Sequence, residues 1–265
     1  KVVILKVEVK SVEFTSDHES GEANILKDNN SNWTDSGTAY VEPEWVKSPA
    51  RNNPISHTKN VSLMAKVMVK VEPSGMTFEL IGDGSEEYVD FDKTGNASTG
   101  GDQEITVTAN ANLPDEICTL NKEIDWSFKF GANEFTADSS GPHKIYVTYG
   151  TPSGSEVTEK RLIWVCITCD GESTLTGIGD KVYDALASEP PKFQLQDPNV
   201  PSPLWLLMSS TNYQGQCIDL ANLMKLHVEL LRVSSSIGFV YGSSDMDFFS
   251  TSDNAFESRS CTNTN

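Results

Sequence analysis

Alternating apolar and polar residues are the feature that most constrains how this chain can fold. In residues 63–71, methionines and lysines alternate with five apolar side chains: Leu63, Ala65, Val67, Val69 and Val71. Successive side chains of a β-strand point to opposite faces, so a period of two indicates a strand with one buried face. The same alternation recurs in residues 105–109, 124–130 and 145–149. We therefore predict a strand in each of these runs.

Turn signals separate the alternating runs. Clusters of glycine with proline, serine, aspartate or asparagine occur at residues 72–75, 82–84, 100–101, 131–133 and 150–154. Short strands separated by turns, with no helical period between them, are typical of an antiparallel β-sandwich of immunoglobulin-like type. The chain is 37% hydrophobic and 22% charged, which is sufficient to form a core. We predict a mostly β fold in which residues 1–168 are an immunoglobulin-like sandwich.

One part of this first half lacks clear periodicity. Residues 15–58 are rich in Asn, Ser, Asp and Pro, and we predict a long loop or an excursion at an edge of the sheet. The three histidines of this half are expected at the surface or in turns: His18, His57 and His143. Residues 83–90 are acidic but lack the ligand spacing of a calcium loop, so we interpret them as an acidic turn.

The five cysteines are an odd number and do not suggest a disulfide framework. Cys166 and Cys169 form a C-x-x-C pair in residues 162–169, a run that we interpret as a strand. A zinc site would require a second pair of Cys or His ligands at suitable spacing, and the sequence shows none. We interpret the pair as structural, with a local or partner disulfide and a metal site as the alternatives. Our prediction includes no metal and no cofactor.

The pattern changes near residue 169. Apolar residues then recur at helical spacing and end before two prolines: Leu175, Ile178, Val182 and Leu186. After a proline-rich loop at residues 190–203, residues 216–232 form a second predicted helix, which is apolar around most of its circumference and should be largely buried. Residues 236–242 are predicted to be a strand. Residues 169–265 are therefore predicted to form a smaller α/β domain.

Cys217 lies in the first turn of the helix predicted over residues 216–232. Unpaired N–H groups and the positive end of the helix dipole favour an anion there, which predicts a stabilised thiolate and a lowered thiol pKa. The preceding Gly215 permits close approach of a substrate to the backbone. A cysteine nucleophile requires this arrangement. The alternative is that Cys217 is a small buried core residue.

The sequence around Cys217 follows a recognisable pattern. Residues 215–223 read Gly-Gln-Cys-Ile-Asp-Leu-Ala-Asn-Leu, residues 230–232 read Leu-Leu-Arg, and residues 238–242 read Gly-Phe-Val-Tyr-Gly. This segment resembles the core of the transglutaminase-like cysteine-protease superfamily, which has a papain-like fold. The family's motif is roughly G-x-C-x-[DE]-x-A-x-L, followed by a leucine-arginine pair and a strand that ends in glycine. The resemblance implies that Cys217 is the nucleophile and that Trp205 is an aromatic residue near the oxyanion.

The superfamily takes a histidine and an aspartate from strands that follow the cysteine helix, because the thiolate requires a base and an orienting group. His227 is the only histidine after Cys217. Ten residues along one helix place it about 15 Å away and about 80° around the axis, so it cannot be the base. The acidic residues beyond Gly242 are interpreted as parts of a solvated loop: Asp245, Asp247 and Asp253. The catalytic partners are therefore either on a continuation of the chain or absent.

Charge and hydropathy exclude several classes of partner. The formal net charge is −18, from 20 basic and 38 acidic residues, which disfavours nucleic acids and anionic membrane surfaces. The sequence contains no apolar run of the length that spans a bilayer. The chain starts at Lys1 rather than methionine, from which we expect a removed secretory leader and a secreted or cell-surface location. Three N-x-S/T tripeptides are attributed to chance in this composition: Asn32, Asn60 and Asn96.

These observations support two hypotheses of function. The first is an extracytoplasmic, bacterial protein with a transglutaminase-like domain that acts on protein or peptide substrates by acyl transfer or peptide hydrolysis through Cys217. Without a base, these 265 residues are expected to show no turnover. The alternative is a non-catalytic surface or adhesive protein that binds its partner through the sandwich. The sequence makes no prediction of the substrate or of the oligomeric state.

Overall fold

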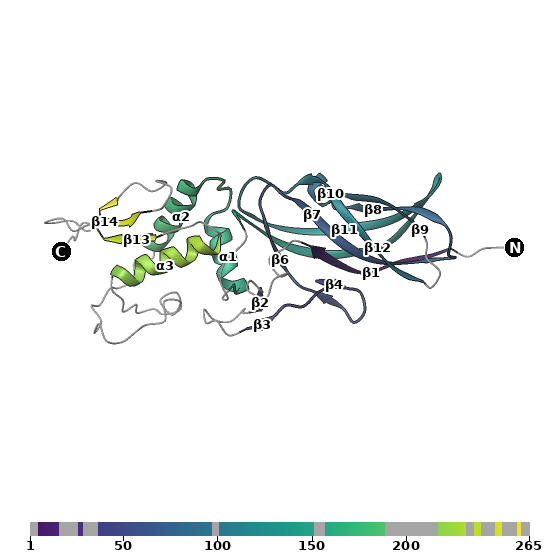
Figure 1. The fold of residues 1–265 in the computed structure, drawn as a ribbon, viewed down its shortest axis with the longest axis horizontal. Coiled ribbons are helices and arrows are strands. Elements are labelled where there is room, and N and C mark those ends of the chain that lie inside the picture. The colour runs from purple at the N-terminus through teal and green to yellow at the C-terminus, as the bar shows by residue number, and fades with distance from the viewer. Residues whose placement is uncertain are drawn as a thin grey trace.

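The computed structural model describes most of the chain. The described residues are 5–15, 26–28, 37–96, 101–150, 157–188, 217–231, 236–239, 247–250 and 259–260. Within these ranges, ten strands form one large curled sheet, and three helices lie beyond one end of it (Figure 1). The predicted mostly β fold is therefore confirmed.

The strands of the sheet follow one another in space in an order that differs from their order in sequence. Neighbouring strands are antiparallel except for the last pair, β12 and β6, which are parallel. From one edge to the other, the strands are β5 (Arg51–Asn52), β4 (Trp45–Val46), β1 (Lys6–Thr15), β7 (Ser62–Glu72), β10 (Asp102–Asn112), β9 (Phe91–Asn96), β8 (Thr77–Asp83), β11 (Cys118–Phe130), β12 (Asn133–Thr148) and β6 (Ile55–Thr58). The four predicted strands correspond to β7, β10, β11 and β12, so those predictions are confirmed.

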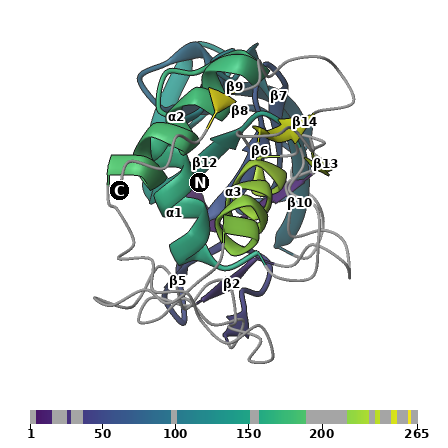
Figure 2. The same ribbon diagram turned by 90° about the vertical axis from the view of Figure 1, so that its left-hand side faces the viewer.

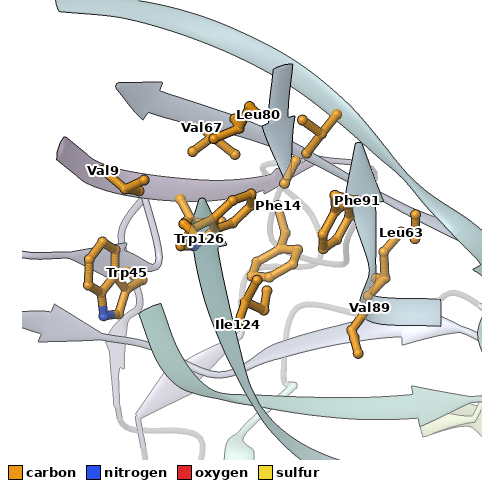
Figure 3. Close-up of a cluster of buried hydrophobic side chains, with 14 of the residues drawn as sticks. Val9, Phe14, Trp45, Leu63, Val67, Leu80, Val89, Phe91, Ile124 and Trp126 are labelled. Carbon is orange, nitrogen blue, oxygen red and sulfur yellow. The ribbon is translucent and has the colours of Figure 1, made fainter. Parts of the chain in front are cut away.

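The sheet curls around a single hydrophobic core. Alternate residues of β7 are buried while those between them are partly or largely exposed, as its period of two predicts. Figure 3 shows Val9 of β1, Leu80 of β8 and Trp126 of β11 in the same buried cluster, although their strands lie in different parts of the sheet. Between β10 and β9 the pairing is limited to Ala109 and Phe91. The strands on either side of this junction contribute inward side chains to one interior.

The segment predicted as a long loop or edge excursion, residues 15–58, supplies both edges of the sheet. β4 and β5 form one edge and β6 the other, so the edge excursion is confirmed for the described part. Trp45 of β4 is buried in the core of the sheet. The same segment also forms a small antiparallel pair, β2 (Lys27–Asp28) and β3 (Thr38–Ala39), which is separate from the large sheet.

Three helices follow the sheet in the described part of the chain: α1 (Glu159–Thr168), α2 (Leu175–Ser188) and α3 (Cys217–Leu230). The helices predicted at residues 175–186 and 216–232 correspond to α2 and α3 and are confirmed. The strand predicted at residues 162–169 is wrong, because this run is α1. The buried apolar residues of α1 and its C-cap recur at i, i+3, i+4 and i+7, which is a helical period: Leu162, Val165, Cys166 and Cys169. The β-branched Ile163, Val165 and Ile167 suggested a strand by propensity, but Ile167 is 68% exposed.

The helices share a second hydrophobic core. Figure 2, viewed from the helical end, shows α1, α2 and α3 in front of the strands of the large sheet. Side chains from all three helices pack there together with Leu26, Ile117 and Tyr146, which come from the strand-forming half of the chain. Beyond α3 lies a three-stranded antiparallel sheet of β13 (Ser236–Phe239), β14 (Asp247–Ser250) and β15 (Arg259–Ser260). α1 begins before the predicted boundary at residue 169 and packs in the helical core.

Candidate functional site

Cys217 is the first residue of α3. This is the position that the sequence predicts, although the side chain of Cys217 is outside the described part of the structure. In the first turn of a helix the backbone N–H groups have no partner within the helix, and the dipole favours a negative charge. A thiolate is favoured at such a position. Trp205, the predicted aromatic residue near the oxyanion, also lies outside the described residues.

The rest of α3 is firmly packed. Six apolar residues of the helix and its end are buried, in addition to His227: Ala221, Leu223, Met224, Val228, Leu230 and Leu231. Its polar side is partly exposed, and there Lys225 Nζ lies 3.5 Å from Glu229 Oε1. Because α3 packs against both α1 and α2, its axis is held by the helical core from Ala221 onward. The prediction of a largely buried helix is confirmed for the residues whose burial is described.

His227 is part of this helical core. Its Nδ1 lies 2.8 Å from the carbonyl oxygen of Leu223, and because a carbonyl can only accept, Nδ1 carries the proton and donates. The imidazole ring also contacts the Trp164 ring, with 4.2 Å between centroids. Burial, with a contribution from the positive charge of Arg161, lowers the pKa of His227 to about 4. His227 is thus a neutral packing residue at pH 7.

His57 and His143 are buried, so the expectation that they lie at the surface or in turns is wrong. His143 Nε2 lies 2.8 Å from Ser140 Oγ, which also accepts a hydrogen bond of 2.8 Å from the indole Nε1 of Trp126. His57 Nδ1 lies 3.1 Å from the carbonyl oxygen of Thr58. Burial lowers the pKa of both imidazoles, that of His143 to about 4. Ser140 and His143 are both closed off from solvent and face the sheet core, so they cannot act on a substrate. His18 lies outside the described residues.

The strands after α3 are in the part of the chain from which the resemblance would take a histidine and an aspartate. Asp247 is the first residue of β14, so its interpretation as part of a loop is wrong. Asp245 and Asp253 lie outside the described residues. β13, β14 and β15 contain no histidine. A helix followed by antiparallel strands is present here, without a histidine on those strands.

The described cysteines are free: Cys118, Cys166 and Cys169. Burial raises the pKa of the Cys118 thiol to about 11 and that of Cys169 to about 12, and it raises the pKa of Cys166 well above the ordinary value. Such thiols are poor nucleophiles at neutral pH. The C-x-x-C pair thus behaves as part of the helical core, as the structural interpretation predicts. Among the described residues, no group of three or more His, Cys, Asp or Glu side chains is placed to hold a metal ion.

The acidic segment at residues 83–90 is a turn held by its own carboxylates. The backbone N–H of Gly84 donates to Asp90 Oδ1 at 2.8 Å, and that of Ser85 donates to Asp83 Oδ1 at 2.9 Å. A single turn of 3₁₀ helix follows at Glu87–Val89. These bonds agree with the interpretation of the segment as an acidic turn.

Comparison with known proteins adds no relative. No protein-family model matches the chain, and a search of curated proteins finds no match. In the described part of the chain, each helix is too short or too polar to cross a membrane. The feature that bears on function is therefore the position of Cys217 at the start of α3.

Proposed function

We propose that this chain is an extracytoplasmic protein in which an immunoglobulin-like sandwich precedes a transglutaminase-like domain with Cys217 as its nucleophile. The observation that carries the proposal is the position of Cys217 as the first residue of α3. The order of elements supports it, because α3 is followed by the antiparallel strands β13, β14 and β15, as the resemblance implies. One observation supports the sandwich. The strands on the β10 side and those on the β9 side of the β10–β9 junction enclose one core.

The proposed chemistry is attack of the Cys217 thiolate on the carbonyl carbon of a protein or peptide amide. The new C–S bond gives a tetrahedral oxyanion, which the free N–H groups of the first helical turn can stabilise. Collapse of this oxyanion breaks the C–N bond, the amine leaves with a proton, and a thioester remains. Water then gives hydrolysis, and a second amine gives acyl transfer.

The proton steps of this scheme require a base that also acts as an acid. His227, the only histidine after Cys217, is buried against Trp164 and bonded to Leu223. We therefore propose that these 265 residues hold an activated thiol but do not turn over substrate by themselves.

The first test is the pH dependence of alkylation by iodoacetamide, followed for each cysteine by mass spectrometry. An activated Cys217 reacts with a midpoint below about pH 8.5, the value of an ordinary thiol. Cys118 is the internal control, because its pKa of about 11 predicts slow alkylation at neutral pH. In the protein unfolded by urea, the two cysteines should react alike. An inert Cys217, or one that titrates like an ordinary thiol, contradicts the proposal.

The second test is an assay of amide hydrolysis and of amine incorporation into a protein substrate. The expected result is no activity above background for the native chain or for Cys217→Ala. Robust turnover that Cys217→Ala abolishes would show that a base is available to the thiol and would contradict the no-turnover part of the proposal.

A second candidate function is a non-catalytic surface or adhesive protein. One observation favours it: His57, His143 and His227 are all buried in structural positions, and β13 to β15 carry no histidine. In this case Cys217 is a core residue and the curled sheet binds the partner. Alkylation separates the two candidates, because a core cysteine stays unreactive until the protein unfolds.

A further inference from the structure

The junction between the curled sheet and the helices contains a buried carboxylate. Glu159 is the first residue of α1, and its side chain is 5% exposed. Glu159 Oε1 accepts a hydrogen bond of 2.7 Å from the hydroxyl of Tyr146 on β12, and Oε2 accepts one of 2.5 Å from the hydroxyl of Tyr40. Lys144 Nζ, also on β12, lies 3.3 Å from Oε1. One carboxylate therefore contacts three parts of the molecule: the helical unit, which consists of α1, α2 and α3, the large sheet, and the segment that contains Tyr40.

The segment around Tyr40 crosses the junction as a short strap, which we define as residues 26–28 and 37–40. Figure 1 shows its strands, β2 and β3, beside α1 and outside the large sheet. The N–H of Lys27 donates to the carbonyl of Val157 at 3.0 Å, and the N–H of Tyr40 donates to that of Leu26 at 3.0 Å. The side chain of Leu26 is fully buried in the helical core. The strap is thus attached to the helical unit at its backbone, its apolar side chain and its tyrosine.

The cluster of Glu159, Tyr40, Tyr146 and Lys144 has the hydrogen bonds and charges of a stable contact. A buried carboxylate is costly unless each of its oxygens is hydrogen-bonded, and here both oxygens accept from phenols while Lys144 supplies a positive charge. Burial, together with the hydrogen bond to Glu159, raises the pKa of Tyr146, so its hydroxyl remains a donor over the whole physiological range. Removal of either phenol leaves a buried carboxylate oxygen without that partner.

Backbone bonds join the helical unit to the sheet elsewhere. Ile117, next to β11, exchanges bonds of 2.8 and 2.9 Å with Gly171 and Glu172, and the N–H of Gly150 donates to the carbonyl of Leu231 at 3.0 Å. These bonds connect neighbouring loops to the ends of helices. The Glu159 cluster differs from them because it holds three separate segments through one side chain.

We propose that Glu159 holds the strap and the helices α1, α2 and α3 against the curled sheet. As a result, the core of the sheet and the core of the helices unfold together as one cooperative unit. The proposal concerns only this junction and holds whether or not Cys217 is a nucleophile. When the contacts of Glu159 are present, the helices should unfold together with the sheet. When these contacts are removed, the helices should unfold separately from it.

The test is native-state hydrogen–deuterium exchange followed by mass spectrometry of peptides. Glu159→Gln keeps the shape of the side chain and removes its charge, and Tyr40→Phe removes one hydroxyl. Each variant should speed exchange of the most protected amides in α1 and α2 by about tenfold, while those in β7 and β11 stay unchanged. The double variant should add little to Glu159→Gln, because both changes act on the same contact between residues 40 and 159.

Two matched variants serve as controls. Glu79→Gln removes a carboxylate that is paired with Lys129 at 3.3 Å on the surface of the sheet. Tyr88→Phe removes the hydroxyl of a tyrosine whose ring lies beside Lys122. Neither should change exchange in α1 or α2. If Glu159→Gln does not fold, Tyr40→Phe provides the test, because Tyr40 is only partly buried.

Two outcomes overturn the proposal. Unchanged exchange in both junction variants means that the cluster does not hold the helices. Equal acceleration in the helices and in the sheet means that Glu159 contributes to global stability without coupling the two cores.

Discussion

At the scale of single residues, Ser140 is the centre of a polar chain inside the core of the sheet. Its hydroxyl oxygen accepts from the indole N–H of Trp126 and lies 2.8 Å from His143 Nε2. All three side chains are buried, so water cannot replace either bond. Ser140 therefore satisfies two polar groups that would otherwise be stranded in the core.

Ser140→Ala should destabilise the protein by about 2 to 4 kcal/mol, because it leaves two buried polar atoms without their partner. The measurement is the free energy of unfolding in urea. Ser139→Ala is the matched control, since Ser139 is exposed and its bond to Asp125 lies on the surface; it should change the free energy by no more than about 0.5 kcal/mol. Equal effects of the two substitutions would contradict this account.

The buried histidines make stability depend on pH. His143 and His227 have pKa values of about 4 in the folded protein, whereas an unfolded histidine has a pKa of about 6.5. Between these values the unfolded chain binds protons that the folded chain does not, so stability is complete above about pH 6.5 and falls as the pH decreases towards 4. Each histidine can account for a loss of up to about 3 kcal/mol.

This dependence can be measured by urea unfolding between about pH 7.5 and about pH 4.5. His227→Phe keeps an aromatic ring against Trp164 but cannot bind a proton, so it should lose a clear part of the wild-type pH dependence. An identical slope in the wild type and in this variant would show that His227 does not titrate as its burial implies.

At the scale of elements, the start of α2 is defined by one side chain. Thr174 immediately precedes the helix, and its Oγ1 accepts a hydrogen bond of 3.1 Å from the N–H of Gly177. This is the bond of an N-cap residue to the third residue of a helix, and it satisfies a donor that has no partner within the helix.

Thr174→Ala should therefore cost about 1 kcal/mol in the free energy of unfolding, whereas Thr174→Ser, which keeps the hydroxyl, should cost less. Ser173→Ala, at the exposed neighbouring position, is the control and should have little effect. Thermal or urea unfolding measures each value. A Thr174→Ser variant as unstable as Thr174→Ala would indicate that the hydroxyl is not the cap.

At the scale of the whole molecule, the net charge of −18 governs which partners can approach. We expect no association with a labelled DNA oligonucleotide at physiological salt in fluorescence anisotropy. The phosphate backbone would require a cluster of basic residues, and acidic residues outnumber basic ones in this chain. Binding tighter than about 100 μM would contradict the expectation, since proteins with basic surfaces reach that range without sequence specificity.

Much of the architecture could be predicted because its signals are local. The alternation in β7 and the helical spacing in α2 and α3 each lie within a dozen or so neighbouring residues, and in each case the buried side follows the pattern. The wrong prediction at α1 could have been avoided from the local sequence. Leu162, Val165, Cys166 and Cys169 follow a helical period, which the strand propensity of the β-branched residues between them obscured. The position of Cys217 at the start of α3 was also predictable from the helical pattern that follows it.

Tertiary structure alone decided how these elements meet. Tyr40 and Glu159 are 119 positions apart in the chain, and the periodicity of neither segment indicates that they touch. The burial of His57 and His143 likewise depends on how distant strands enclose the core. The sequence by itself determined the strands β7, β10, β11 and β12 and the helices α2 and α3, because backbone geometry gives each a repeating burial pattern. Contacts between remote segments depend on how the sheet curls and where the helices pack against it, and no local period records this.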